Sequence, residues 1–299
     1  MIYNFCAAIL RSAGDARRPM LFLTWGGMLK IILTYVFVAV LELGVAGVAF
    51  STIISWTFTA VLGICALMRN KGILKLKVNR IRFYKNDVVK VLKIGIPAGM
   101  QQALYSVANV VITATVNSFG TKATTGISIA NNFDDVLYQI CVATSLAVMP
   151  YVSQNVGRGD IKRATQSVTR GIGITVGLGL TFGMISAGFS GQLSSIMSSD
   201  PEVIAFARQK MVIISSTYFI YGINEILAAA LRGMGRPTIA TVTTLLYMCT
   251  MRLAWVYLVF PHFRNITSLY IIWPIGWVMS IITLLLFYIP TVRKLKTCS

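Results

Sequence analysis

Long apolar stretches with very few charges recur along this chain, and they limit what it can fold into more than any other feature. Only 12% of its 299 residues are charged, and 56% are hydrophobic. An ordinary soluble domain is about one quarter charged. A run of roughly 20 mostly apolar residues is long enough to cross a bilayer as a helix. The sequence therefore predicts an all-α polytopic membrane protein.

Eight such spans can be drawn, together with one shorter apolar segment at the beginning. The short segment covers residues 2–10. The predicted spans cover about 20–41, 46–68, 94–117, 124–152, 171–193, 211–231, 238–260 and 268–290.

The basic residues are distributed unequally between the connections. Of the 27 Lys and Arg residues, 21 fall in alternate connections and the tail, and four, including Arg208 and Lys210, fall in the other connections. The last two, Lys30 and Arg252, lie within spans. Cytoplasmic loops collect Lys and Arg, so we expect a multi-pass protein of the plasma (inner) membrane with a cytoplasmic C-terminus. The net charge of +18 then reflects orientation rather than binding to nucleic acid.

Motifs for enzymatic chemistry are missing from the sequence. It has no CxxC pair and no GxxxxGK[ST] phosphate loop, and its one histidine, His262, lies in a connection. Without these motifs, neither a metal centre nor nucleotide hydrolysis is expected. We expect no cofactor and no enzyme activity.

An internal repeat divides the chain. Residues 2–14 (IYNFCAAILRSAG) and 223–235 (INEILAAALRGMG) match at six of thirteen positions, and a proline follows each. Both lie on the basic side, so the repeat is parallel, a recurrent plan of transporters. We expect two helical bundles, the first incomplete: a remnant at 1–68, a linker at 69–93 and a six-helix bundle at 94–299. The basic linker fits an amphipathic segment on lipid headgroups and a solvated linker equally well.

Four sequence stretches resemble the multidrug and toxic compound extrusion (MATE) transporters. They are LRSAGDARRPM (10–20), KIGIPAGMQQALYS (93–106), MPYVSQNVGRGDIKRA (149–164) and AALRGMGRPTIA (229–240). In that family they resemble the end of the fourth helix, the start of the seventh, the end of the eighth and the end of the tenth. The resemblance implies that this chain corresponds to the end of helix four through helix twelve.

Ionisable residues inside the spans are the first candidates for a functional site, because such groups are costly in a membrane. Asp134 and Asp135 fall about ten residues into one span, near the middle of the membrane. Asn131, Asn132 and Tyr138 lie within a turn of them. This cluster is the leading candidate for a site that couples transport to Na⁺ or H⁺. A later helix start would instead place both acids in the outer headgroup region.

Two further groups of polar residues are candidates for an ion or substrate site. Glu225 is within reach of Arg252 by depth, and we expect the two to pair. Gln101, Tyr105 and Asn109 share one helix face with i,i+4 spacing, and they either line a cavity or hydrogen-bond to other helices. In several MATE branches an acid stands at the position of Tyr105 and another near Tyr221. The sequence departs from that pattern, so those two acids are not carried over.

The resemblance implies export of drugs or other organic solutes, often cations, by Na⁺ or H⁺ antiport. A lipid or oligosaccharide flippase of the same wider group is the alternative. Only two cations lie within the predicted spans, which favours the exporter, because a flippase needs several cations for a pyrophosphate headgroup. The expected partners are a small organic substrate and membrane lipids. We expect no transport from these 299 residues alone.

Overall fold

The structure is a computed structural model that describes residues 1–70, 75–77, 82 and 84–298. It forms two compact units, residues 1–88 and 89–299. Every regular element in the described residues is helical, as the sequence predicts. The tail of the predicted linker, which we placed at 69–93, belongs to a helix that begins at Lys85. Residues 71–74, 78–81 and 83 of that linker lie outside the described part.

The first unit is a small helical hairpin with one further helix. It contains α1 (Ile2–Ser12), α2 (Arg17–Tyr35) with the π-helical segment η1 (Val36–Val40), and α3 (Gly44–Arg69). Its small core consists of Cys6, Leu10 and Leu67. Most apolar side chains of α2 point outward, which is expected where lipid rather than protein surrounds a helix.

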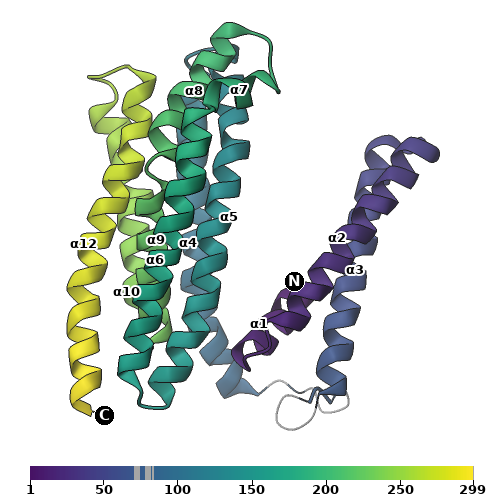
Figure 1. Ribbon diagram of the computed structural model, residues 1–299, viewed down its shortest axis with the longest axis vertical. Coiled ribbons are helices and arrows are strands. Elements are labelled where there is room, and N and C mark those ends of the chain that lie inside the picture. Colours follow the sequence, from purple (N-terminus) through teal and green to yellow (C-terminus); the bar gives the residue numbers. More distant parts are fainter. Residues whose placement is uncertain (71–74, 78–81, 83, 299) are drawn as a thin grey trace. The chain divides into compact units, whose positions relative to one another are not determined.

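The second unit is a bundle of helices that run side by side (Figure 1). Its helices are α4 (Lys85–Asn117), α5 (Thr121–Gly157), α6 (Ile161–Gly188), α7 (Ser190–Ser195), α8 (Pro201–Ser215), α9 (Tyr218–Gly233), α10 (Pro237–Thr244), η4 (Leu245–Thr250), α11 (Met251–Ala254), η5 (Trp255–Val259) and α12 (Ile266–Cys298). Helix α5 contacts α6, α8 and α9, and α9 contacts α6 and α12. Helix α5 therefore has a central position in the bundle, and the candidate acids Asp134 and Asp135 lie on it.

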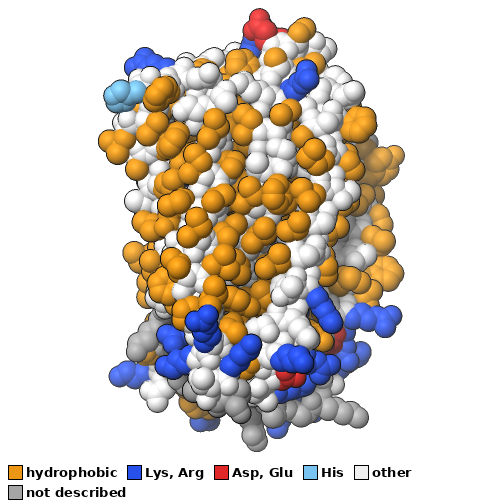
Figure 2. All heavy atoms as spheres, turned by 60° about the vertical axis from the view of Figure 1, so that its left-hand side comes forward, with side chains coloured by type: hydrophobic (Ala, Val, Ile, Leu, Met, Phe, Trp, Pro, Cys, Tyr) orange, Lys and Arg blue, Asp and Glu red, His pale blue; other side chains and the backbone are white. Residues whose placement is uncertain are grey.

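Six helices in the described residues are long and apolar enough to cross a membrane, and a seventh candidate is the pair α8 and α9, bent by 46°. Helix α4 covers the predicted span 94–117 but is not one of the six. The predicted span 211–231 is wrong at its start, because that passage begins at Pro201 and breaks between Ser215 and Tyr218. Figure 2 shows hydrophobic side chains over the middle of one face and Lys and Arg gathered at one end.

The two copies of the internal repeat end in the same local structure. After α1, the Gly14 and Asp15 amides donate to the carbonyls of Arg11 and Leu10; after α9, the Gly235 and Arg236 amides donate to those of Arg232 and Leu231. Both glycines have positive φ, 90° and 77°. This is the pattern of a Schellman cap, in which glycine takes the left-handed conformation. The Leu-Arg-x-x-Gly sequence that the two repeats share therefore ends a helix in both places.

Small residues bring the helices of the second unit close together. A Cβ atom added to Gly126 of α5 would lie 2.5 Å from the Val203 carbonyl of α8, and one added to Gly183 of α6 would overlap the Ser215 carbonyl of α8. Helix α8 therefore lies directly against two glycines, and this close packing fixes the depth of its side chains. The polar residues at the α5–α8 contact depend on that depth.

Candidate functional site

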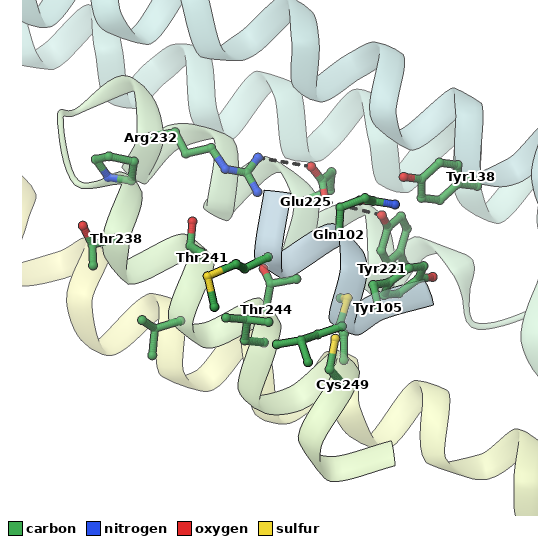
Figure 3. A pocket seen from close by; sticks show the side chains of 16 residues that line it. Gln102, Tyr105, Tyr138, Tyr221, Glu225, Arg232, Thr238, Thr241, Thr244 and Cys249 are labelled. Carbon is green, nitrogen blue, oxygen red and sulfur yellow. Dashed lines mark hydrogen bonds and ion pairs between the residues drawn. The ribbon is translucent and has the colours of Figure 1, made fainter. Parts of the chain in front are cut away.

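Among the described residues of the second unit, two chambers contain most of the predicted site residues. The first, which we name the Asp134 chamber, has a volume of about 440 Å³ and is lined by residues of α4, α5, α8, α9 and α12. The second, the Glu225 chamber, has a volume of about 670 Å³ and is lined by residues of α4, α5, α9, α10 and η4 (Figure 3). Tyr105 and Tyr138 line both chambers.

A buried ion pair lies in the wall of the Asp134 chamber. The Lys210 ammonium nitrogen is 2.9 Å from a carboxylate oxygen of Asp134, and the two side chains are only 7% and 10% exposed. Lys210 also donates to the amide oxygen of Asn131, and the Ser215 hydroxyl donates to Asp134 over 3.4 Å. Taking two charges out of water is costly unless they pair with good geometry, and here the pair joins α5 to α8.

The hydropathy pattern places Lys210 in a connection, and Lys210 is therefore missing from the predicted site residues. The structure places it nine residues into α8 with an exposed fraction of 6%. A signal for this was present: Asp200 accepts a hydrogen bond from the Glu202 amide as the N-cap, and Pro201 occupies the first turn. An N-cap Asp followed by Pro and Glu marks a helix start. The apolar stretch alone begins later, which is why the start was predicted at 211.

The two neighbouring acids of α5 have different surroundings. Successive helix residues point about 100° apart, and Asp134 is buried whereas Asp135 is exposed. Both line the Asp134 chamber. They lie 13 and 14 residues after the start of α5 at Thr121, or roughly 20 Å along the helix, so the helix does not start late. Asn131 and Asn132 are both exposed; Asn131 lines the same chamber, whereas Asn132 donates to the Ser128 carbonyl of its own helix.

An aromatic cluster separates the charged groups of the two chambers. The rings of Tyr138 and Tyr221 are stacked with their centroids 5.7 Å apart, and Tyr221 also contacts Tyr218 and Trp277. Because Tyr105 and Tyr138 belong to both chambers, movement of either ring changes both cavities. The sequence predicted Tyr105, Tyr138 and Tyr221 as site residues, whereas Tyr218 and Trp277 were not singled out.

Glu225 pairs with a residue of its own helix. Its carboxylate is 3.4 Å from the Arg232 guanidinium and accepts a hydrogen bond from the Tyr221 hydroxyl, as Figure 3 shows. The expected pair between Glu225 and Arg252 is therefore wrong. Residues seven apart lie two turns away on one helix face, so Arg232 reaches Glu225 along α9. Depth alone, on which the expectation rested, does not say which face a residue occupies.

Arg252 instead lies among aromatic rings. Its guanidinium is 3.5 Å from the centroid of the Trp273 ring and 5.5 Å from that of Tyr105. The residue is 2% exposed, and its Nη1 has no hydrogen-bond partner among the described residues. The buried Tyr270 hydroxyl, which belongs to a residue lining the Asp134 chamber, also has none there. Cation–π contact stabilises Arg252. One of its guanidinium N–H groups, near the Asp134 chamber, nevertheless has no hydrogen-bond acceptor among the described residues.

The polar stripe predicted on α4 is divided between the chambers. Asn109 lines the Asp134 chamber, and Gln102 lines the Glu225 chamber. The side chain of Gln101 lies outside the described residues. Within the described part of the chain, no three His, Cys, Asp or Glu side chains come together as a metal site. The candidate site is thus a pair of cavities with aromatic walls and internally paired charges.

A bundle of apolar helices that encloses cavities with buried, paired charges defines a class of protein: the helical membrane transporter. Charges in such positions are typical of substrate and ion pathways. The MatE family model matches residues 97–258, more than half of the chain. The chain therefore belongs to the MatE family, the multidrug and toxic compound extrusion transporters, as the four stretches indicated.

Curated relatives agree with this assignment. The probable multidrug resistance protein YpnP of Bacillus subtilis is 27% identical over 250 residues, which cover 84% of this chain and 56% of that protein. The FAD transporter of Shewanella oneidensis is 26% identical over 240 residues, 79% of this chain and 53% of that protein. The chain thus spans about half the length of the curated relatives that it matches.

Solved structures show the same fold. A MOP superfamily transporter from Pyrococcus furiosus superposes with a TM-score of 0.88 at 18% identity, over 98% of this chain and 66% of that one. The Vibrio cholerae MATE transporter VcmN in the bent form gives a TM-score of 0.84 at 20% identity, over 99% and 67%. The multi-pass helical architecture expected from the sequence is therefore confirmed.

Proposed function

We propose that this protein acts as a secondary active exporter of drugs or other organic solutes, often cations, driven by antiport of Na⁺ or H⁺. Two helical bundles rock about the substrate and expose it to each side of the membrane in turn. The protein lies in the plasma (inner) membrane with its C-terminus in the cytoplasm, where Lys and Arg gather. Its partners are a small organic substrate and the surrounding lipids.

The buried Asp134–Lys210 pair is the observation that supports this proposal most. A membrane bundle that needed only stability would lose little by replacing such a pair with apolar side chains. The pair instead lines a chamber within the bundle, next to the exposed carboxylate of Asp135. A carboxylate that can exchange its partner is what cation-coupled transport requires, and Asp134 has one partner that is already a cation.

The Glu225 chamber suits an organic solute. Tyr105, Tyr138 and Tyr221 provide aromatic surface, and Glu225 provides one carboxylate whose charge is already balanced by Arg232. Ligand pockets are mostly apolar with a few placed polar groups, and aromatic faces attract cations. A bulky organic cation would gain contact with the rings and compete with Arg232 for Glu225.

The test is ethidium efflux from cells that express this sequence, alone or within a twelve-span gene, with pH and Na⁺ gradients imposed separately. Asp134→Asn should abolish gradient-driven efflux at equal protein level. Glu202→Gln is the matched control, because it makes the same acid-to-amide change at an exposed side chain of α8, and its efflux should be unchanged. Efflux in the Asp134→Asn variant at the unsubstituted rate would contradict the proposal.

A lipid or oligosaccharide flippase, or another carrier of anionic solutes, is the second candidate. It is favoured by the buried Arg252, whose Nη1 lacks a hydrogen-bond partner among the described residues. One relative is an FAD transporter, and one structural neighbour, from Pyrococcus furiosus, is described as a transporter whose binding pocket of reverse polarity suggests a different function. Arg252→Gln discriminates the two: it should abolish uptake of an anionic solute such as FAD into everted vesicles, whereas ethidium transport should survive.

A further inference from the structure

The Lys210 ammonium lies between a carboxylate oxygen of the buried Asp134 and the amide oxygen of the exposed Asn131, and we call this set of two oxygen ligands the cage. Asp134 and Asn131 are three residues apart on α5, so their side chains share a face. Lys210 reaches both from α8, with 2.9 Å between its nitrogen and the Asp134 carboxylate. Ser215, also on α8, donates to the other carboxylate oxygen. A carboxylate oxygen and an amide oxygen are also the kinds of ligand that a hard monovalent cation such as Na⁺ would bind.

The cage leaves no net charge for an added cation to balance. Asp134 and Lys210 are both more than nine-tenths buried, so a Na⁺ ion could enter only if the ammonium left its partners. Removing one partner from a buried pair leaves an uncompensated charge, which is strongly unfavourable. The lysine is tethered to α8 and cannot diffuse away, so it competes with any free ion at a very high effective concentration.

We infer that Lys210 is a built-in cation that fills the cage of Asp134 and Asn131, excludes Na⁺ from it, and leaves H⁺ as the ion that this site exchanges. A hydronium ion transfers its proton to the Asp134 carboxylate and leaves as water, and the hydrogen bond from the ammonium to that carboxylate breaks. Lys210 keeps its positive charge and its hydrogen bond to Asn131, and Asp135 in the same chamber supplies the counter-charge. This choice of ion rests on the proposed antiport, whereas occupation of the cage by Lys210 does not.

The other groups around Asp134 allow this exchange. Helix α5 contributes the carboxylate of Asp135 in the same chamber, α9 contributes Tyr218, and α12 contributes Tyr270. Helix α6 contributes Ser186, whose hydroxyl donates to Ser215. Apart from Lys210, the charged group facing the chamber among the described residues is Asp135. When Asp134 is neutral, Asp135 is therefore the other acid of this chamber to which the released ammonium can turn.

The experiment measures binding of radioactive ²²Na⁺ to the purified 299-residue chain in detergent micelles at alkaline pH, with thermal unfolding followed with and without NaCl against choline chloride. The unsubstituted chain and Lys210→Arg, which keeps the positive charge, should bind no Na⁺. Lys210→Met should open the cage, bind one Na⁺ per chain and gain thermal stability from NaCl. Lys210→Met/Asp134→Asn should lose both effects.

Two results would overturn the inference. One is saturable Na⁺ binding by the unsubstituted chain that disappears in Asp134→Asn; this measurement does not depend on any lysine variant. The other is a Lys210→Met chain that is folded and monodisperse but binds no Na⁺. If the cage behaves as expected but the protein transports nothing under a pH gradient in the efflux assay, the proposed antiport fails and the assignment of Lys210 stands.

Discussion

The ion pairs in the walls of the two chambers, Asp134–Lys210 and Glu225–Arg232, contain the same kinds of charge but differ in how they are held. Asp134 and Lys210 come from different helices, and their side chains are 10% and 7% exposed. Glu225 and Arg232 lie on one helix, and their side chains are 17% and 32% exposed at a separation of 3.4 Å. The first pair holds two helices together out of water, whereas the second lies along α9 in the wall of a large chamber.

The comparison shows that the energetic effect of a charge inside a membrane protein depends on how deeply its ion pair is buried. Loss of one partner from a buried pair leaves a charge with no solvent around it. Loss of one partner from a partly exposed pair is compensated in part by water and costs less. The Asp134 pair should therefore govern both stability and ion exchange, whereas the Glu225 pair should govern what the chamber binds.

Breaking the Asp134–Lys210 pair should have the largest effect on stability. We expect Asp134→Asn or Lys210→Met to lower the free energy of unfolding by about 3–5 kcal/mol. The double variant should lose much less than the sum, because no unpaired charge remains. Chemical unfolding in micelles followed by tryptophan fluorescence would measure this cycle. Strictly additive losses would show that the two groups do not interact.

Overpacking the contact between α6 and α8, next to that pair, should have the next largest effect on stability. A Cβ on Gly183 would overlap the Ser215 carbonyl of α8, so Gly183→Ala should destabilise the chain by about 1–3 kcal/mol through overpacking. Gly177→Ala on the same helix is the control, because nothing lies within 4 Å of its added Cβ. If both variants unfold at the same temperature, α6 and α8 do not pack as described.

Substitutions in the Glu225 pair should change stability little. Glu225→Gln should cost at most about 1 kcal/mol, because the pair is local and partly solvated. The same variant should weaken ethidium binding, measured by fluorescence in micelles, because it removes the carboxylate of the Glu225 chamber. A loss of stability as large as that of Asp134→Asn would remove the contrast between the two pairs.

The smallest effect concerns the start of α8, outside both chambers. The hydrogen bond from the Glu202 amide, aided by the nearby Lys122 ammonium, lowers the pKa of the Asp200 carboxyl below its usual value. Its stabilising effect is therefore present above the pKa of the unfolded chain and is lost as the pH falls through the lower, folded value. Asp200→Ala should lower Tm slightly at neutral pH and not at all in strong acid. An equal shift at both pH values would contradict the role of this carboxylate as a cap.

Much of the fold follows from the sequence because membrane helices must be apolar and continuous. The spans at 46–68 and 124–152 fall within α3 and α5, and the repeated Leu-Arg-x-x-Gly stop recurs as two equal caps. The start of α8 was missed because hydropathy averages over a long window. Arg208 and Lys210 interrupt the apolar pattern there, although Asp200 and Pro201 mark the boundary.

The candidate site was predicted only in part, for a related reason. Helix periodicity groups Asn131 with Asp134 and Tyr105 with Asn109, and these groupings depend on one helix each. The partner of Asp134 lies 76 residues further along the chain, and no local pattern specifies it. The same limit explains why Glu225 was assigned to Arg252: the sequence gives an approximate depth, but which faces meet is decided by packing, here by glycines such as Gly183.

The most direct test of this account is infrared difference spectroscopy of the purified chain between alkaline and acidic pH, with and without Na⁺. The account predicts that acid produces the band of a protonated carboxyl group that is missing in Asp134→Asn, that Glu202→Gln retains it, and that Na⁺ leaves it unchanged. A spectrum in which Na⁺ alone alters the Asp134 band, while acid does not, would contradict proton exchange at the Asp134–Lys210 pair.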